Sequence, residues 1–229
     1  MDLASITTWK AIYEMTWQTL IVTFLSTTLA YLLGLPVGVL LNATSKTGVK
    51  PIKSLHFVLG LIVNILRSIP CLIIIVLCIP LTRKIMGIGS GEWYTILIPM
   101  TITAFGLTAR MVEQSLNEVP AGEIEAVKSL GASNWQLITK VIVPEAKASL
   151  ITGISVVAVS ILGYTSFAYN IGAGGLISGI YRYYANNTGD YLKSPYFWIL
   201  IVIVVLIVQL IQELGLKIAK KIDKRRVLR

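Results

Sequence analysis

The chain has 229 residues, of which 55% are hydrophobic and 14% are charged, and its formal net charge is +9. Soluble domains carry about 25% charged residues, so this composition excludes an ordinary soluble protein and indicates a chain embedded in a membrane. The basic residues cluster beside apolar runs, which favours anionic lipid headgroups over nucleic acid as their partner.

Five apolar segments predict an all-α integral membrane protein with five transmembrane helices. Each segment is close to the roughly 20 apolar residues that a helix needs to cross a bilayer. The segments cover about 17–41, 56–81, 94–112, 150–168 and 196–212. The last one is rich in β-branched residues, but we expect a helix there because an isolated strand leaves its backbone polar groups unsatisfied in lipid.

The distribution of lysine and arginine predicts the orientation, because these residues are enriched in cytoplasmic loops. With the N-terminus outside and the C-terminus inside, thirteen basic residues fall on the cytoplasmic side and five on the outside. We therefore expect a single transmembrane domain over 1–229 in the cell membrane, with a membrane core at about 17–211. A loop at about 119–145 and a basic tail at 217–229 then lie in the cytoplasm.

The cytoplasmic loop has the pattern of two short amphipathic helices. Pro120 can begin the first helix, and Gly131 can end it with a turn that glycine adopts cheaply. Ser133 or Asn134 can cap the second. Apolar residues such as Trp135 favour either docking of a partner or packing on the chain's own helix ends, and periodicity alone does not separate the two.

The same loop resembles the E-A-A loop of ABC importer permeases. That pattern is Glu-Ala-Ala, three residues, Gly, nine residues, then Ile-x-Leu-Pro. The spacing here is unbroken, with conservative apolar changes at Val127, Val141 and Val143. The resemblance implies that the loop forms a coupling helix that seats in a groove of a partner ATPase. The coupling residues that it implies are Glu125, Ala126, Val127, Gly131, Ala132, Val141, Val143 and Pro144.

Several shorter stretches resemble the methionine ABC transporter permeases in particular. They are Gly34–Leu41, Arg67–Pro70, Ala109–Glu113, Gly163–Ser166 and Gly172–Leu176. The resemblance implies a homodimeric, five-span permease that imports methionine by alternating access, without a cofactor. Its implied partners are a second copy of the chain, cytoplasmic ABC ATPase subunits, an extracytoplasmic substrate-binding protein and membrane lipid, with no nucleic acid. The alternatives are a permease for another small solute, or an ion-coupled carrier or channel that acts alone.

Two groups of residues are candidates for the transport pathway. Arg67 is the one charge deep in a predicted span, where a charge costs about 2.5 kcal/mol or more unless it faces protein or water. It either lines the pathway or binds carbonyls freed by a kink at Pro70. The second group follows from the resemblance, because those permeases constrict their path near this stretch, where a phenylalanine would act as an apolar plug. This group is Gly163, Tyr164, Ser166 and Phe167.

Other patterns predict packing or exclude functions. Gly34 and Gly38 form a G-x-x-x-G pair, which favours close helix packing, and Arg110 and Glu113 are spaced for an ion pair. The sequence lacks a G-x-x-x-x-G-K-[ST] motif, so we expect ATP hydrolysis by a partner and no enzyme activity in this chain. Its single histidine has no second histidine or carboxylate pair nearby, so neither a metal site nor a hydrolase site is expected.

Overall fold

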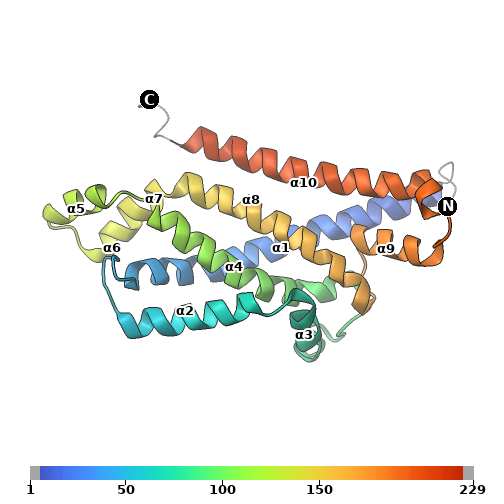
Figure 1. Cartoon of the computed structure of the whole chain (residues 1–229), viewed down its shortest axis with the longest axis horizontal. Coiled ribbons are helices and arrows are strands. Elements are labelled where there is room, and N and C mark those ends of the chain that lie inside the picture. The colour runs from blue at the N-terminus through green and yellow to red at the C-terminus, as the bar shows by residue number, and fades with distance from the viewer. Residues whose placement is uncertain (1–5, 224–229) are drawn as a thin grey trace. The chain divides into compact units, whose positions relative to one another are not determined.

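The computed structural model describes residues 6–223, and all regular elements in this range are helices (Figure 1). The α-helices are α1 (Ile6–Thr44), α2 (Lys53–Ser68), α3 (Cys71–Met86), α4 (Leu97–Asn117), α5 (Ala121–Ser129), α6 (Asn134–Leu137), α7 (Val143–Glu145), α8 (Lys147–Tyr164), α9 (Leu176–Asn186) and α10 (Pro195–Ile222). Short 3₁₀ segments cover Trp93–Ile96, Thr165–Ile171 and Tyr191–Lys193, and a π-helical turn covers Ile138–Ile142. The predicted all-α class is confirmed. Part of the predicted basic tail, residues 224–229, lies outside the described range.

Four helical stretches of the described chain are long and apolar enough to cross a membrane, and the α2–α3 pair makes a fifth if it counts as one broken span. The four stretches are Ile6–Thr44, Trp93–Asn117, Lys147–Ile171 and Pro195–Ile222. All four contain a predicted span and extend beyond it. The helices are longer than a bilayer requires, so their ends reach into the loops that carry the candidate sites.

The second predicted span is broken at Pro70 into two helices that are bent by 102°. The helix stops at Ser68, and both Ile69 (φ −79°, ψ 123°) and Pro70 (φ −56°, ψ 138°) leave the helical region before α3 begins at Cys71. Proline disfavours a helical conformation in the residue before it and cannot donate the next helical hydrogen bond. Cys71 and Cys78, both on α3, are buried free thiols.

The chain divides into two compact units. The first consists of Met1–Thr28, Pro70–Ile102 and Ala158–Gln212, and the second of Leu29–Ile69, Thr103–Val157 and Glu213–Arg229. Four helices, α1, α4, α8 and α10, continue from one unit into the other.

In the first unit, α9 is attached to the early part of α1, as Figure 1 shows. The side chains of Gln18 and Thr19 accept hydrogen bonds from the backbone N–H groups of Gly175 (3.0 Å) and Leu176 (2.8 Å). The first N–H groups of a helix have no partner within the helix, so α1 supplies the acceptors that α9 lacks. Leu176 also belongs to the buried apolar core of this unit, together with Tyr196.

In the second unit, two glycines bring α1 against α4. A Cβ atom added at Gly34 would lie 2.8 Å from the Thr108 side chain, and one added at Gly38 would lie 2.6 Å from the Ala109 carbonyl oxygen. Real Cβ atoms do not approach other atoms so closely, so α1 comes this near to α4 at these two positions only because both lack a side chain. The predicted packing role of this glycine pair is confirmed.

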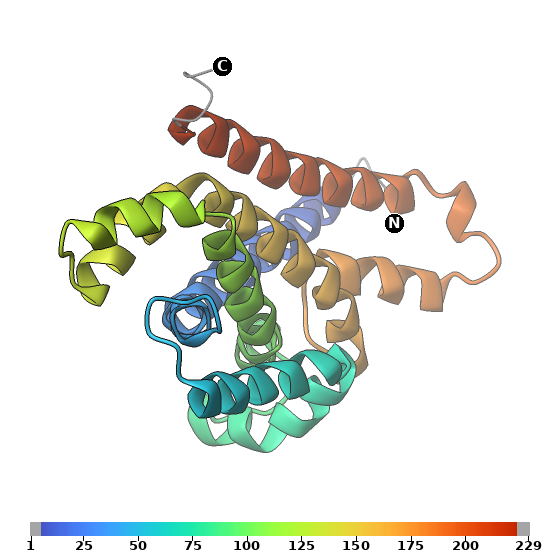
Figure 2. The ribbon, with the colours of Figure 1, turned by 60° about the vertical axis from the view of Figure 1, so that its left-hand side comes forward.

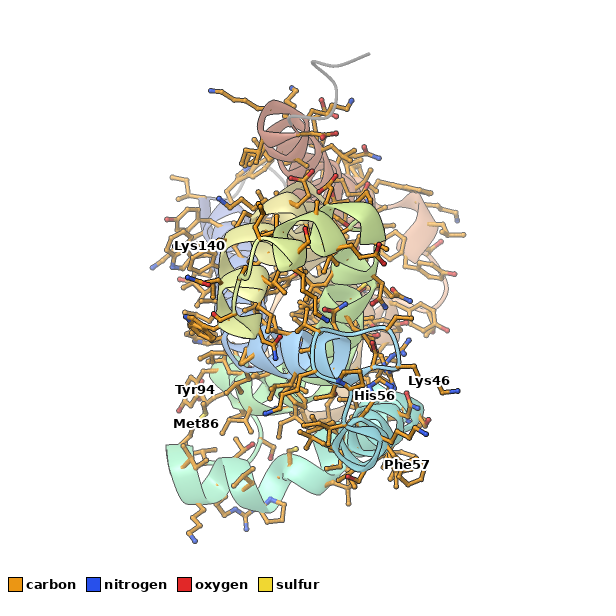
Figure 3. The ribbon with its side chains drawn as sticks, turned by 90° about the vertical axis from the view of Figure 1, so that its left-hand side faces the viewer. Lys46, His56, Phe57, Met86, Tyr94 and Lys140 are labelled. Atoms are coloured by element: carbon orange, nitrogen blue, oxygen red, sulfur yellow. The ribbon has the colours of Figure 1, made fainter. Side chains whose placement is uncertain are left out.

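Polar contacts join α2 to its neighbours in the same unit. Arg110 of α4 forms the predicted ion pair with Glu113 (2.6 Å) and also donates to the Gly60 carbonyl (3.2 Å) and the Asn64 side chain (2.9 Å) of α2. On α2, His56 points toward the end of α1, and its Nδ1 lies 3.0 Å from the Leu41 carbonyl oxygen, whereas the neighbouring Phe57 points away (Figure 3). The histidine therefore has a structural contact.

Candidate coupling loop and transport pathway

The loop between α4 and α8 contains the two short helices predicted from sequence, α5 and α6. Pro120 precedes α5, and Leu130 and Gly131 follow its last residue. Gly131 has φ +84°, and its N–H donates to the Lys128 carbonyl oxygen (3.0 Å). An L-residue in this left-handed conformation costs about 1–2 kcal/mol, so the turn between α5 and α6 favours glycine.

A capping box begins α6. The Ser133 hydroxyl accepts from the Gln136 backbone N–H (3.3 Å), and the Gln136 side chain accepts in turn from the Ser133 backbone N–H (2.8 Å). Two N–H groups that a helix start leaves unpaired are satisfied by this exchange. Of the two predicted caps, Ser133 is therefore the one used. Figure 2 shows α5 and α6 as neighbours that a short turn connects.

After α6 the backbone widens into a π-helical turn, which the sequence analysis missed. The Val143 N–H bonds to the Ile138 carbonyl oxygen, one residue further back than in an α-helix. Pro144 follows directly; it has no N–H, and its ring would clash with the carbonyl of Lys140 in a regular α-helix. Pro144 was therefore the feature of the sequence from which the π-helical turn could have been predicted. Lys140, within the turn, points outward (Figure 3).

The loop has a buried side and an exposed side. Leu137 and Ile142 are buried, and Ile142 belongs to a core that includes Val112 and Leu116 of α4. In contrast, Leu130 is 85% exposed and Trp135 is 73% exposed. Periodicity alone did not separate docking of a partner from packing on the chain's own helices, and both now apply to different residues. Some apolar side chains pack on the chain's own helices, whereas two large ones face outward and are available to a partner.

The predicted coupling residues fall into two sets. Glu125, Ala126 and Gly131 are exposed, on α5 and at the turn that follows it. The others are half-buried: Val127 and Ala132 on or near α5, and Val141, Val143 and Pro144 on the π-helical turn and α7. The first set offers a surface, and Val143 of the second set packs against the core that contains Ile142.

The predicted pathway residues of the first unit lie where α8 changes into a 3₁₀ helix. Tyr164 is the last residue of α8, and the 3₁₀ segment begins at Thr165. Gly163 is exposed, and a Cβ atom added there would meet no atom within 4 Å. Tyr164, Ser166 and Phe167 are half-buried, so all four predicted residues retain some accessible surface.

The structure places Arg67 beside the break between α2 and α3. It is in the last turn of α2, and its side chain is exposed. Its methylene groups pack near Gly106, where an added Cβ atom would lie 3.0 Å from the Arg67 Cγ. Within the described residues its guanidinium forms no hydrogen bond or ion pair, so one of the two alternatives, the contact with carbonyls freed at Pro70, is not made there.

Curated relatives match the chain over most of its length. It is 38% identical over 218 residues to a probable D-methionine transport system permease protein of Haemophilus influenzae, covering 95% of this chain and 100% of the relative. It is also 40% identical over 150 residues to the D-methionine transport system permease protein of Escherichia coli K12, covering 66% of this chain and 69% of the relative.

Solved structures match the fold. A methionine ABC transporter in an inward-facing conformation aligns with a TM-score of 0.89 at 33% identity, covering 97% of this chain and 99% of that one. An amino acid ABC transporter aligns with a TM-score of 0.75 at 19% identity, covering 96% and 99%, and this likeness concerns the fold alone. The model of the family described as binding-protein-dependent transport system inner membrane components matches residues 34–223. The chain belongs to this family of multi-pass membrane components.

Proposed function

We propose that the chain is the permease subunit of an ATP-driven ABC importer and moves methionine across the cell membrane by alternating access. The observation that carries this proposal is the loop over α5 and α6, which turns Glu125, Ala126 and two large apolar side chains outward. An apolar surface of this kind, outside the spans, suits docking of another protein.

The attachment of the loop suggests how the motion of an ATPase reaches the pathway. Leu137 and Ile142 hold the loop in the second unit, and α8 follows directly after α7. The α8 helix is unbroken for 18 residues, which corresponds to about 27 Å at 1.5 Å per residue. It ends at Tyr164, among the pathway residues. A displacement of the loop therefore acts on a continuous helix, and Gly163 to Phe167 respond at its end.

The partners follow from this role. Two copies of the chain form the pathway, each binds one ATPase subunit through the 119–145 loop, and an extracytoplasmic binding protein delivers the substrate. Methionine is supported as the substrate by two curated relatives that are named probable D-methionine transport system permease proteins. Each of them aligns with 95% of this chain. Membrane lipid covers the exposed apolar side chains of the long helices, such as Phe24 and Leu206.

The test is uptake of labelled D- and L-methionine into proteoliposomes that contain the permease, its ATPase and its binding protein. We expect the uptake to require ATP. We also expect unlabelled methionine to suppress the uptake more strongly than other unlabelled amino acids do. Uptake by the permease without the ATPase would overturn the importer proposal in favour of a carrier. ATP-dependent uptake of another solute, with none of methionine, would overturn the substrate.

A pair of matched variants tests the docking surface. Ala126→Trp places a bulky side chain on α5, and we expect it to abolish retention of the ATPase in a pull-down. Ala185→Trp makes the same change at an exposed position near the end of α9 and should retain the ATPase. Equal retention by both variants would show that the exposed face of α5 is not the docking surface.

A further inference from the structure

A cavity of about 550 Å³ lies in the first unit. It is open to the surface and is lined by the start of α1, the Gly91–Trp93 segment, the Gly172–Gly175 turn, α9 and the start of α10. Its volume falls within the roughly 300–1,000 Å³ typical of sites for small molecules. The loop between α5 and α6 is not part of it, so the cavity is separate from the coupling surface.

Charges of both signs line this cavity. Glu14 comes from α1, Glu92 from the segment after α3, and Arg182 from α9. Within the described residues, none of the three forms an ion pair or a hydrogen bond through its side chain. An arginine presents a fork of donors that matches a carboxylate, and carboxylates accept strong hydrogen bonds from an ammonium group. The lining therefore offers a separate partner for each charge of a small zwitterion.

The rest of the lining includes aromatic side chains. The rings of Tyr183 and Tyr196 lie 5.0 Å apart, and Trp93 lines the cavity beside the Gly172–Gly175 turn. A Cβ atom added at Gly174 would lie 3.2 Å from the Trp93 Cβ, so the absence of a side chain there keeps the wall open. Aromatic rings of this kind make favourable contacts with a thioether or with another apolar side chain.

We propose that this cavity binds a free α-amino acid with an apolar side chain. Arg182 binds its carboxylate, Glu92 and Glu14 bind its ammonium group, and Trp93 and Tyr183 contact its side chain. The predicted orientation places the cavity at the outer end of the permease, where it holds the amino acid as it enters. The identity of the ligand, methionine, rests on the proposed function.

The experiment is calorimetric titration of the full-length permease, purified in detergent with its ATPase subunits and without a binding protein. The probes are L-methionine, N-acetyl-methionine, which lacks the ammonium charge, and methionine methyl ester, which lacks the carboxylate. Of these three probes, we expect only L-methionine to show saturable binding. Arg182→Gln and Glu92→Gln should each weaken it about tenfold or more, because each removes a charged hydrogen-bond partner.

Two further variants separate this effect from misfolding. Arg182→Lys keeps the charge without the fork and should give an intermediate loss of affinity. Arg83→Gln removes an exposed arginine at the end of α3 that does not line the cavity, and it should bind methionine like the wild type. Equal weakening by Arg83→Gln and Arg182→Gln would overturn the site.

The remaining outcomes distinguish this inference from the proposed function. If the wild type transports methionine with its binding protein but binds none in the titration, the cavity is not an amino-acid site and the importer proposal stands. Loss of binding-protein association in Arg182→Gln, with no methionine binding in the wild type, would make the cavity a docking surface instead. Binding and transport of a different amino acid, dependent on both charges, would support the site and overturn methionine as the substrate.

Discussion

Substitution of Gly131 provides a direct test of the coupling loop. Gly131 has φ +84°, and a Cβ atom added there would meet no other atom within 4 Å. The substitution Gly131→Val therefore creates no steric clash with neighbouring residues. Its cost arises in the backbone, because a β-branched residue strongly disfavours a positive φ.

The structure sets the size of this effect. The left-handed conformation costs an L-residue about 1–2 kcal/mol, which corresponds to a roughly 5- to 30-fold change in the population of the turn. We expect Gly131→Val to weaken ATPase association by about this factor and to reduce uptake, while insertion into the membrane is unchanged. Asparagine tolerates positive φ better than other residues with side chains, so Gly131→Asn should restore most of the association.

Gly87 provides the matched control. It follows α3 with φ +80°, and an added Cβ atom would also meet nothing within 4 Å. The substitution Gly87→Val thus introduces the same backbone strain outside the coupling loop. Association is measured as the binding of purified ATPase to surface-immobilised permease, and uptake is measured in proteoliposomes. Normal association of the Gly131→Val variant, or an equal loss in the Gly87→Val variant, would refute the assignment of this turn to coupling.

Three further predictions concern orientation, pathway and packing. In a cysteine-free background, an impermeant reagent applied to intact cells should label a cysteine at Asn187 and not one at Lys128; the opposite pattern would reverse the orientation. Phe167→Ala should raise uncoupled ATPase activity in the assembled complex, because it removes apolar bulk from the predicted constriction, and unchanged activity would assign Phe167 to packing. Gly38→Leu should destabilise the protein by about 1–3 kcal/mol or more, because its side chain would meet α4, and thermal unfolding in detergent measures this loss against Gly122→Leu, whose position is open.

Features that depend on short stretches of chain could be predicted from the sequence. The apolar runs determined that the chain forms helices, since lipid leaves no other way to satisfy the backbone of an isolated segment. The Gly131 turn and the Ser133 cap were predictable because both involve residues within a few positions of each other. The spacing from Glu125 to Pro144 likewise supported the resemblance to the E-A-A loop without any knowledge of tertiary contacts.

Features that depend on distant neighbours were decided by the tertiary structure. Pro36 and Pro80 lie within continuous helices, whereas the helix breaks at Pro70, so the presence of a proline does not determine a break. Leu137 and Trp135 are both apolar residues of α6, and only packing against other helices buries the first and leaves the second exposed. The cavity joins residues far apart in sequence, such as those of α1 and α9, because α1 supplies the hydrogen-bond acceptors for the start of α9. Such contacts depend on where each helix packs, which the pattern of a single segment does not encode.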